Sequence, residues 1–244
     1  MTDLEGKTCV VTGATSGIGR PLTFALAERG GHVYAIGRSR ERLDSLLEES
    51  VGLGGEITGV LADLEQDEGI GRVVELVLAG QDGVDVLAHS AGAIVLGAVG
   101  ETTIDDLDRQ YRVNLRAPIA LTQALLPALE RAGGQVVFVN SSAALKASAN
   151  NVLYAATKAG LKWFADGLRD QVNVDGVRVI SVYVGRTATP MQEYVHEHEG
   201  RTYDPDLLLQ PGEVVQALLS ALAMPATAEI TDISVRPMRK PPVT

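Results

Sequence analysis

The sequence predicts an α/β fold in which helices cover both faces of a doubly wound parallel sheet. Short apolar runs of strand length alternate with segments of helical periodicity along the whole chain, which is typical of parallel strands joined by crossover helices. The first apolar run leads directly into a glycine-rich turn and a helix. The 244 residues include no linker rich in Pro, Gly or Ser, so we expect a single three-layer domain.

The composition bears on the partners and on the one cysteine. A net charge of −10 argues against nucleic acid or an anionic membrane as a partner, since either would need a basic face. Cys9 lies inside the first apolar run, so it forms no internal disulfide and should be buried in a strand. No signal peptide and no apolar stretch of membrane-spanning length is visible, so we expect a cytoplasmic protein.

A glycine-rich turn joins the predicted strand Lys7–Thr12 to a predicted helix, Pro21–Arg29. This arrangement lets backbone N–H groups and a helix N-terminus meet a pyrophosphate. A tight turn without a ligand is the alternative. The candidate cofactor-binding residues in the turn are Gly13, Thr15, Ser16, Gly17, Ile18 and Gly19.

Arg38 follows the second predicted strand, His32–Gly37, and bears on the choice of cofactor. In an NAD site, an acidic residue about twenty positions past the first glycine binds the ribose 2′-hydroxyl. The chain has no acidic residue there before Glu41, and a guanidinium suits a 2′-phosphate. We therefore expect NADP(H) to be preferred, with NAD(H) possible. The alternative is that Arg38 only caps a strand or pairs with a nearby acid.

Asp63 follows the third predicted strand, Glu56–Leu61, and has two interpretations. It could accept a hydrogen bond from an adenine amino group. It could equally be the N-cap of the next helix, which is predicted over Ile70–Ala79. From the residue alone, the cap is the safer interpretation.

Small residues follow the fourth predicted strand, Val84–Ala88. Ala91 and Gly92 would let the backbone approach a ligand there. The segment Asp105–Leu129 then predicts one long helix that carries Asn114. Because an asparagine inside a helix usually points to solvent, we expect Asn114 to be exposed.

The stretch around Tyr154 and Lys158 holds the candidate catalytic residues. The two residues are four apart in a segment of helical periodicity, so the phenol and the ammonium should share one helix face. Ser141 and Ser142 follow the fifth predicted strand, Val136–Val139, at the sheet edge where open α/β sheets bind ligands. A hydroxyl, a phenol and a lysine there suggest proton transfer to a substrate oxygen, although turn serines and a solvated helix face give the same pattern.

Residues 190–210 follow the sixth predicted strand, Val177–Val184, and look irregular. A loop of this length is usually a lid or a binding segment. His196 and His198 lie in this segment among acidic residues. We interpret them as solvated lid residues rather than metal ligands, so we expect no metal site. The remaining predicted elements are a helix at Glu41–Ser50, a helix from near Pro211 to Met224, and a last strand at Glu229–Val235.

Over about residues 5–235 the chain resembles the single-domain short-chain dehydrogenases/reductases, which have a Rossmann fold. Four motifs occur in the family's order and spacing, and together they are specific. They are the loop Thr12-Gly13-x-x-x-Gly17-x-Gly19, the pair Asp63-Leu64, the helix residue Asn114, and Tyr154-x-x-x-Lys158 with Ser141 thirteen residues before the tyrosine.

The resemblance implies roles for the site residues. Tyr154 would exchange a proton with the substrate oxygen, and Ser141, or Ser142 in its place, would hydrogen-bond that oxygen. Lys158, with the oxidised nicotinamide, would lower the phenol's pKa, and it would also bind a ribose hydroxyl. Asn114 would keep a water in the relay behind Lys158.

The resemblance also implies cofactor contacts, and the chain departs from the family pattern at two of them. Asp63 and Leu64 would contact the adenine. The family's Asn-Asn-Ala-Gly is His89-Ser90-Ala91-Gly92 here, and its Pro-Gly after the sixth strand is Val184-Gly185. The remaining expected cofactor contacts, besides Tyr154 and Lys158, are Ala91, Gly92, Gly185, Thr187 and Thr189, of which the threonines would bind the nicotinamide amide.

These observations predict an NADP(H)-dependent oxidoreductase that interconverts a carbonyl and a secondary alcohol. The alternatives are an NAD-linked alcohol dehydrogenase and a non-catalytic protein that senses a dinucleotide. The predicted lid carries apolar residues, which suits a small neutral or apolar substrate. Family members are commonly homodimers or homotetramers, so the resemblance implies an oligomer.

Overall fold

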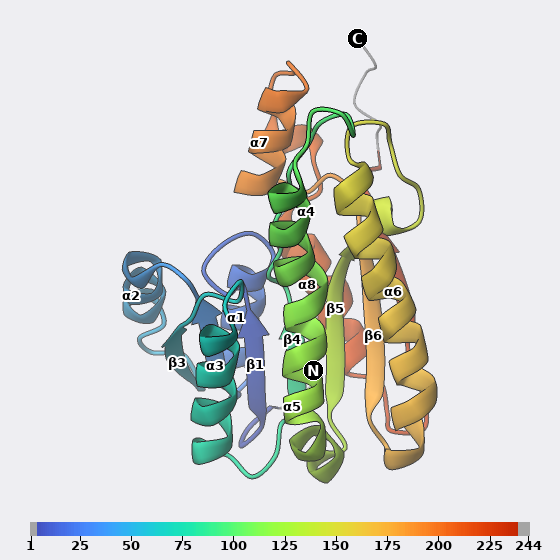
Figure 1. Cartoon of the computed structure of the whole chain (residues 1–244). Coiled ribbons are helices and arrows are strands. Elements are labelled where there is room, and N and C mark those ends of the chain that lie inside the picture. The colour runs from blue at the N-terminus through green and yellow to red at the C-terminus, as the bar shows by residue number, and fades with distance from the viewer. Residues whose placement is uncertain (1–3, 239–244) are drawn as a thin grey trace.

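The computed structural model describes residues 4–238, and a parallel sheet of seven strands forms its centre. The strands lie in the order β3-β2-β1-β4-β5-β6-β7, so the chain starts in the middle, builds to one edge, returns and builds to the other (Figure 1). This is the doubly wound sheet that the sequence predicts. The strands are β1 (Thr8–Thr12), β2 (His32–Gly37), β3 (Glu56–Leu61), β4 (Val86–His89), β5 (Gln135–Ser141), β6 (Arg178–Val184) and β7 (Asp232–Val235).

Helices cover both faces of the sheet and bury its side chains in two cores. The helices are α1 (Gly19–Ala27), α2 (Arg40–Glu49), α3 (Asp67–Gly80), α4 (Ile104–Tyr111), α5 (Ala117–Ala132), α6 (Val152–Val172), α7 (Pro190–His198) and α8 (Pro211–Leu222). One core lies between the sheet and α3, α5 and α6, and the other between the sheet and α1, α2 and α8 (Figure 1). Val10 faces the first core and Cys9 and Val11 face the second, because successive strand side chains point to opposite faces. Cys9 is buried as expected.

The predicted strands agree with the structure within a few residues, except for the start of β7. Glu229 was expected to begin this strand, but β7 begins at Asp232. The Glu229 carboxylate instead accepts a 2.6 Å hydrogen bond from the backbone N–H of Val179 on β6. The side chain of Glu229 thus takes the place of a backbone partner.

The predicted helix Asp105–Leu129 is interrupted. A π-helical turn at Arg112–Arg116 separates α4 from α5, and Asn114 lies in it. Asn114 is fully buried, so the expectation that it faces solvent is wrong. Single π turns are common at functional sites, and the partners of Asn114 described below account for its burial.

The segment after Thr189 is more regular than predicted. Thr189 is the N-cap of α7, accepting a hydrogen bond from the N–H of Gln192, and Pro190 occupies the first turn. Both residues favour a helix start. Only the part after α7 is irregular, apart from a short 3₁₀ helix at Pro205–Leu207. Two further 3₁₀ helices lie at Ser142–Ala144 and Asn173–Asp175.

His196 is not a solvated residue as expected. It is buried on α7, with Nδ1 2.8 Å from the carbonyl oxygen of Gln192 and its ring edge-on to Tyr203. His198 is exposed. Among residues 4–238, no three His, Cys, Asp or Glu side chains are placed to bind one metal ion.

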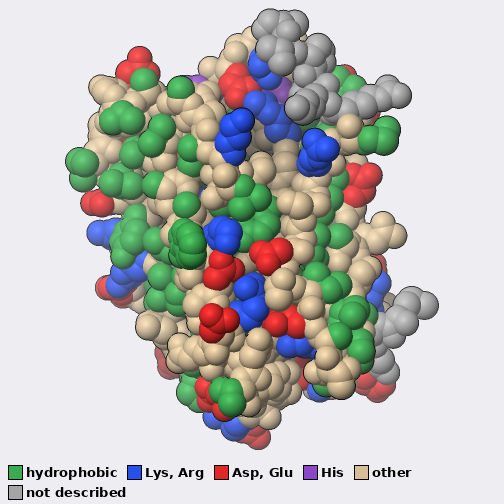
Figure 2. All heavy atoms as spheres, turned by 90° about the vertical axis from the view of Figure 1, so that its right-hand side faces the viewer, with side chains coloured by type: hydrophobic (Ala, Val, Ile, Leu, Met, Phe, Trp, Pro, Cys, Tyr) green, Lys and Arg blue, Asp and Glu red, His purple; other side chains and the backbone are tan. Residues whose placement is uncertain are grey.

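Charged residues pair along the face that carries the β7 edge of the sheet. Asp166 on α6 binds both Lys162, at 2.5 Å, and Arg169, at 3.1 Å. Arg169 also donates to the carbonyl oxygen of Thr231 just before β7. Figure 2 shows this face, with acidic and basic side chains interspersed over its middle. Charges of this kind discourage another strand from pairing with an exposed sheet edge. None of the helices in the described range is long and apolar enough to cross a membrane.

Candidate active site

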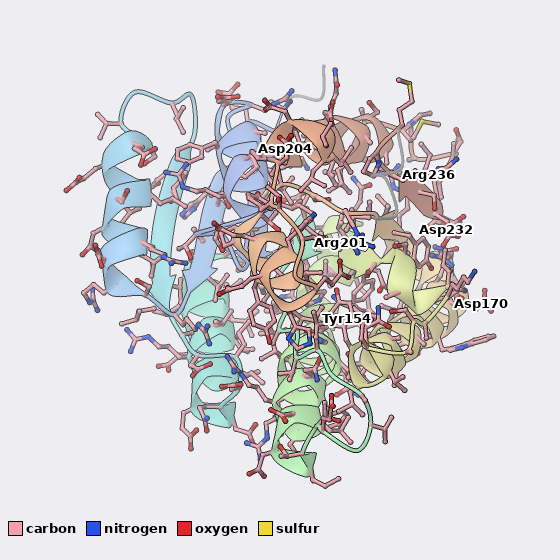
Figure 3. The ribbon with its side chains drawn as sticks, turned by 90° about the horizontal axis from the view of Figure 1, so that it is seen from above. Tyr154, Asp170, Arg201, Asp204, Asp232 and Arg236 are labelled. Atoms are coloured by element: carbon pink, nitrogen blue, oxygen red, sulfur yellow. The ribbon has the colours of Figure 1, made fainter. Side chains whose placement is uncertain are left out.

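Strand β5 and the first turns of α6 bring Ser141, Tyr154 and Lys158 to the carboxyl end of the sheet. Ser141 is the last residue of β5, and Tyr154 and Lys158 lie one turn apart on the inner face of α6. Only 8% of Tyr154 and 4% of Lys158 are exposed. Seen from above, Tyr154 lies near the middle of this end, whereas Asp170, Asp232 and Arg236 lie toward the outer edge (Figure 3). The solvated-face interpretation of this pair is therefore wrong.

Each of the three side chains has a different partner. The hydroxyl of Ser141 accepts a 3.1 Å hydrogen bond from the N–H of Ala143 and lies near enough to the phenol of Tyr154 to act on its pKa. Lys158 Nζ donates to the carbonyl oxygen of Val139 at 3.2 Å and lies 5.9 Å from the centre of the Tyr154 ring. Ser142 is exposed, so Ser141 is the better placed of the two serines.

Burial controls the proton affinities of the pair. It raises the pKa of Tyr154 to about 12, against an opposing effect of the Ser141 hydrogen bond. Burial lowers the pKa of Lys158 to about 8, because an ammonium loses its hydration there. The lowered phenol pKa expected from Lys158 together with an oxidised nicotinamide stays a prediction, and in this arrangement Nζ binds Val139.

Asn114 connects the loop after β4 to α6. Its Oδ1 accepts from the N–H of Ala93 at 2.8 Å, and its Nδ2 donates to the carbonyl oxygen of Ala93 at 2.8 Å and to Thr157 Oγ1 at 3.0 Å. These two bonds use both N–H groups of the amide. Thr157 in turn donates to the carbonyl oxygen of Tyr154 at 2.8 Å, so Asn114 is linked to the helix turn that carries the phenol.

The glycine turn contacts two other strand ends. Gly13 has a φ of +65°, and a Cβ there would lie 2.8 Å from the Cα of Ala91. Gly17 has a φ of +54°, and its Cβ would lie 3.5 Å from the side chain of Thr189. Thr12 Oγ1 accepts 3.1 Å bonds from the N–H groups of both Ser90 and Ala91. A side chain at Gly13 would overlap the backbone of Ala91, so this position requires glycine for the close packing of the glycine turn on the segment after β4.

Thr189 lies beside the glycine turn, next to Gly17, despite the change from Pro to Val184. Thr187 is buried and forms a bridge to Leu209. The hydroxyl of Thr187 donates to the carbonyl oxygen of Gly185, and the hydroxyl of Thr189 donates to the carbonyl oxygen of Thr187. Gly92 lies close to the candidate catalytic lysine, since an added Cβ there would be 4.0 Å from Lys158 Nζ.

Arg38 is exposed just beyond β2 and has no ion-pair partner among the described residues. The cap of α2 is Ser39, which accepts from the N–H of Arg42 at 3.3 Å. The interpretation of Arg38 as half of an ion pair is therefore wrong, whereas its interpretation as a residue that only caps the end of β2 stays open. Its free guanidinium at the end of β2 fits an anionic group on a ribose.

Asp63 lies after β3 and is not a helix cap. The N-cap of α3 is Gln66, whereas Asp63 Oδ1 accepts a 3.0 Å hydrogen bond from the N–H of Glu65. The cap interpretation of Asp63 is therefore wrong. Leu64 is buried in the core under α3.

No role of its own is predicted for His89 from the sequence, although this position departs from the family pattern. His89 is buried at the end of β4, where its ring stacks on Phe138 at 5.0 Å and Nε2 lies 2.9 Å from Thr122 Oγ1. Burial, and secondarily the charge of Lys158, lowers its pKa to about 3. The imidazole is thus neutral and joins β4 to α5.

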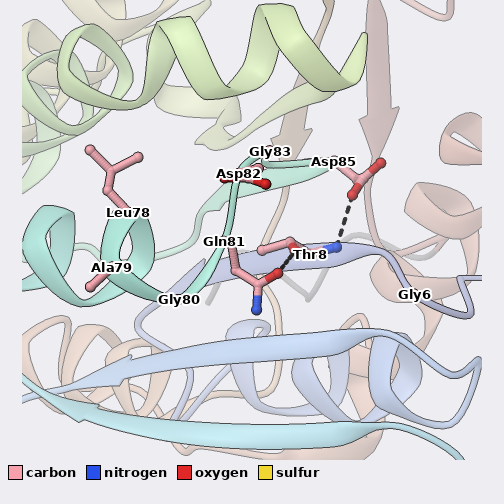
Figure 4. Close-up of a pocket in the computed structure, with 9 residues that line it drawn as sticks. All are labelled: Gly6, Thr8, Leu78, Ala79, Gly80, Gln81, Asp82, Gly83 and Asp85. Atoms are coloured by element: carbon pink, nitrogen blue, oxygen red, sulfur yellow. Dashed lines mark hydrogen bonds between the residues drawn. The ribbon is translucent and has the colours of Figure 1, made fainter.

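A hollow of about 380 Å³ lies at the opposite, amino end of the sheet (Figure 4). Thr8 lines this hollow. Its backbone N–H donates to the Asp85 carboxylate at 2.8 Å, and its hydroxyl donates to Gln81 Oε1 at 2.9 Å. Lys7 pairs with the same carboxylate at 2.9 Å. The polar groups of this hollow bind one another, and the candidate catalytic residues lie at the other end of the strands.

The fold and the glycine turn define a doubly wound protein of the dinucleotide-binding class. A model of the short chain dehydrogenase family matches residues 7–200. The chain therefore belongs to the short-chain dehydrogenase family of oxidoreductases, as the resemblance predicts.

Individual relatives match over nearly the full length. The chain is 28% identical to an uncharacterised oxidoreductase of Staphylococcus aureus (strain MW2), over 98% of this chain and 100% of the relative. A metagenomic short-chain oxidoreductase solved in complex with NADP superposes with a TM-score of 0.83 at 26% identity, covering 98% of this chain and 100% of the other. A short chain dehydrogenase from Burkholderia cenocepacia, also in complex with NADP, gives 0.83 at 28% identity, covering 96% and 98%.

Proposed function

We propose that this protein is an NADP(H)-dependent oxidoreductase that interconverts a carbonyl and a secondary alcohol. The observation that carries the proposal is the grouping of Ser141 at the end of β5 with the buried Tyr154 and Lys158, one helix turn apart at the start of α6. A hydroxyl and a phenol placed this way can both reach one substrate oxygen.

The side chains divide the work on that oxygen. Tyr154 donates its proton to the carbonyl oxygen in reduction and removes it from the hydroxyl in oxidation, and Ser141 orients the oxygen by a hydrogen bond. Oxidation requires a phenolate, which Lys158 favours when its ammonium approaches the phenol oxygen. Lys158 therefore exchanges its bond to Val139 for one to the reacting groups. Asn114 keeps the Tyr154 turn in place through Thr157.

The glycine turn, with Thr15, Ser16 and Ile18, would hold the cofactor's pyrophosphate, and Arg38 a 2′-phosphate. Asp63 and Leu64 would contact the adenine, and Ala91, Gly92, Thr187 and Thr189 the nicotinamide side. When bound, the nicotinamide supplies or accepts the hydride. The NADP complexes of the two solved relatives support this cofactor choice.

The segment 190–210 stays a predicted lid, and a small neutral or apolar substrate stays the predicted class. α7 exposes Tyr194, and Leu207 follows it. The C-terminal end of α7 is bound to the segment after β6. Arg186 in that segment donates to both carboxylate oxygens of Glu199, at 2.7 and 2.8 Å. A lid requires that cofactor and substrate together reduce protease cutting in this segment, and undiminished cutting would exclude one.

The choice of cofactor is the decisive test, and fluorescence titration with NADPH and NADH measures it. If Arg38 binds the 2′-phosphate, NADPH binds about one to two decades more tightly than NADH, since a charge-assisted pair contributes roughly 1.5–3 kcal/mol. Arg38→Asp should reverse the order. Arg72→Asp, the same charge change at an exposed arginine of α3, controls for net charge and should leave the order unchanged.

Equal affinities in the wild-type protein would contradict the assignment of Arg38. Failure to bind either dinucleotide would contradict the proposed function altogether. Turnover is then measured with NADPH or NADP on a panel of ketones, aldehydes and alcohols.

A further inference from the structure

Asn140 is a buried amide between the two halves of the candidate site. It is the next-to-last residue of β5 and is 1% exposed. Its Oδ1 accepts a 2.8 Å hydrogen bond from the N–H of Ser141, and its Nδ2 donates at 3.1 Å to the carbonyl oxygen of Lys158. The Asn140 side chain thus links the backbone of the serine to the backbone of the lysine, 18 residues later in the chain.

The neighbouring contacts show what this link fixes. Three consecutive residues of β5 each contact the start of α6. Val139 accepts from the Lys158 ammonium, Asn140 donates to the Lys158 carbonyl oxygen, and the Ser141 hydroxyl lies near the Tyr154 phenol. Of these contacts, only the one to Nζ uses a side chain that must move in the proposed reaction. The Asn140 bonds join backbone to backbone and so set the distance between hydroxyl and phenol.

We propose that Asn140 is a positioning residue for the reaction, holding Ser141 and Tyr154 at a fixed separation while the Lys158 ammonium moves. This inference rests on the proposed function. An asparagine suits the position because one planar group carries both an acceptor and a donor. A carboxylate would lack the donor, and an aliphatic side chain would remove the acceptor that Asn140 offers to the half-buried N–H of Ser141.

The same strand offers a matched control at its other end. Gln135 is also a buried amide of β5, and its Nε2 donates at 3.2 Å to a helix carbonyl oxygen, that of Leu222 on α8. Gln135→Ala therefore removes a comparable strand-to-helix bond far from Tyr154. A general loss of stability should affect both variants, whereas a loss of positioning should affect only Asn140.

The experiment compares Asn140→Ala, Asn140→Asp and Gln135→Ala by steady-state kinetics, NADPH binding and amide hydrogen exchange. Asn140→Ala should lower kcat about 10- to 100-fold, the scale expected when reacting groups are displaced by up to about 1 Å. NADPH affinity should stay within about threefold, since the glycine turn and Arg38 are unchanged. Exchange should accelerate in the peptide covering residues 139–145, a readout that needs no substrate.

Asn140→Asp has nearly the same shape and keeps the acceptor for Ser141. It should lower kcat similarly while leaving exchange in residues 139–145 slow, and it carries the test if Asn140→Ala does not fold. Gln135→Ala should keep wild-type kcat.

An active wild-type protein whose Asn140→Asp variant retains full kcat would overturn this inference alone. Equal kcat losses in Gln135→Ala and Asn140→Ala would do the same. A wild-type protein that binds NADPH and turns over no carbonyl or alcohol would overturn the proposed function, and the positioning role with it.

Discussion

The two ends of the parallel sheet hold buried and half-buried polar groups in opposite ways. At the amino end, Asp85 binds the Lys7 ammonium and the N–H of Thr8, and the hydroxyl of Thr8 continues to Gln81. At the carboxyl end, Lys158 forms no ion pair with any residue of the described range, and its ammonium donates to a backbone carbonyl.

The two lysines show the physical consequence. The hydrogen bond and the charge of Asp85 raise the pKa of Lys7, whose side chain is about half exposed. Burial lowers the pKa of Lys158 to about 8. At the amino end, the pairing of Lys7 with Asp85 therefore raises the free energy of unfolding. At the carboxyl end, the buried and unpaired charge of Lys158 lowers it. Groups of the second kind are the ones that take part in chemistry.

The largest effect is expected at the carboxyl end, in Tyr154→Phe. The variant keeps the ring and its packing but removes the group that exchanges the proton. Turnover should fall by at least ~10²-fold, the lower end of what a positioned general acid contributes. NADPH affinity should stay within a few-fold.

Lys158→Met should differ from Tyr154→Phe, because the lysine is assigned two roles. It should lose turnover and cofactor affinity together, as measured by initial rates and fluorescence titration. Full activity of Tyr154→Phe on a verified substrate would show that the mechanism is wrong.

An effect of intermediate size is expected on stability, and its sign is unusual for a loss of function. Lys158→Met removes a buried charge without an ion-pair partner. The fall in the pKa of Lys158 from 10.5 to about 8 corresponds to on the order of 3 kcal/mol. The Val139 carbonyl loses its donor, at a cost of about 1 kcal/mol. We therefore expect the free energy of unfolding at pH 7 to rise by about 2 kcal/mol.

The pH dependence identifies the cause of that gain. Between about pH 8 and pH 10.5 the unfolded wild-type chain binds more protons at Lys158 than the folded one, so wild-type stability rises with pH relative to the variant. The advantage of Lys158→Met is complete below the folded pKa and disappears above 10.5. Urea denaturation of both proteins across this range measures it, and a constant difference would attribute the gain to packing instead.

The smallest effect on function is expected at the amino end. Asp85→Ala removes the partner of Lys7 and of the Thr8 N–H, which should lower the free energy of unfolding by about 1–3 kcal/mol. Turnover and NADPH affinity should remain at wild-type values, because this end lies away from Tyr154. A tenfold loss of turnover without unfolding would break the distinction between the two ends.

Much of the fold could be predicted because its signals are local. The alternation of apolar runs and helical segments predicts the doubly wound sheet, and the strand Glu56–Leu61 agrees at both ends. The spacing of Tyr154 and Lys158 puts them on one helix face because four residues make about one turn. The glycine turn could be placed because its glycines follow directly on a strand.

The remaining features depend on contacts between residues far apart in the sequence. The burial of Asn114 could not be predicted locally, because its partners Ala93 and Thr157 lie 21 and 43 positions away in the sequence. His196 is buried because α7 packs its ring against Tyr203. Contacts of this kind leave no periodic pattern in the sequence. The sequence therefore predicts exposed side chains for both Asn114 and His196.

The sequence by itself determined the family, the order of the elements and the residue types at the site. Local propensity, periodicity and spacing carry that information. The tertiary structure alone decided how those residues behave. Packing of α6 on β5 excludes water from Tyr154 and Lys158 and shifts their pKa values in opposite directions. The same packing lets the side chain of Asn140 link two backbones, because only the folded chain brings β5 and α6 within hydrogen-bonding distance.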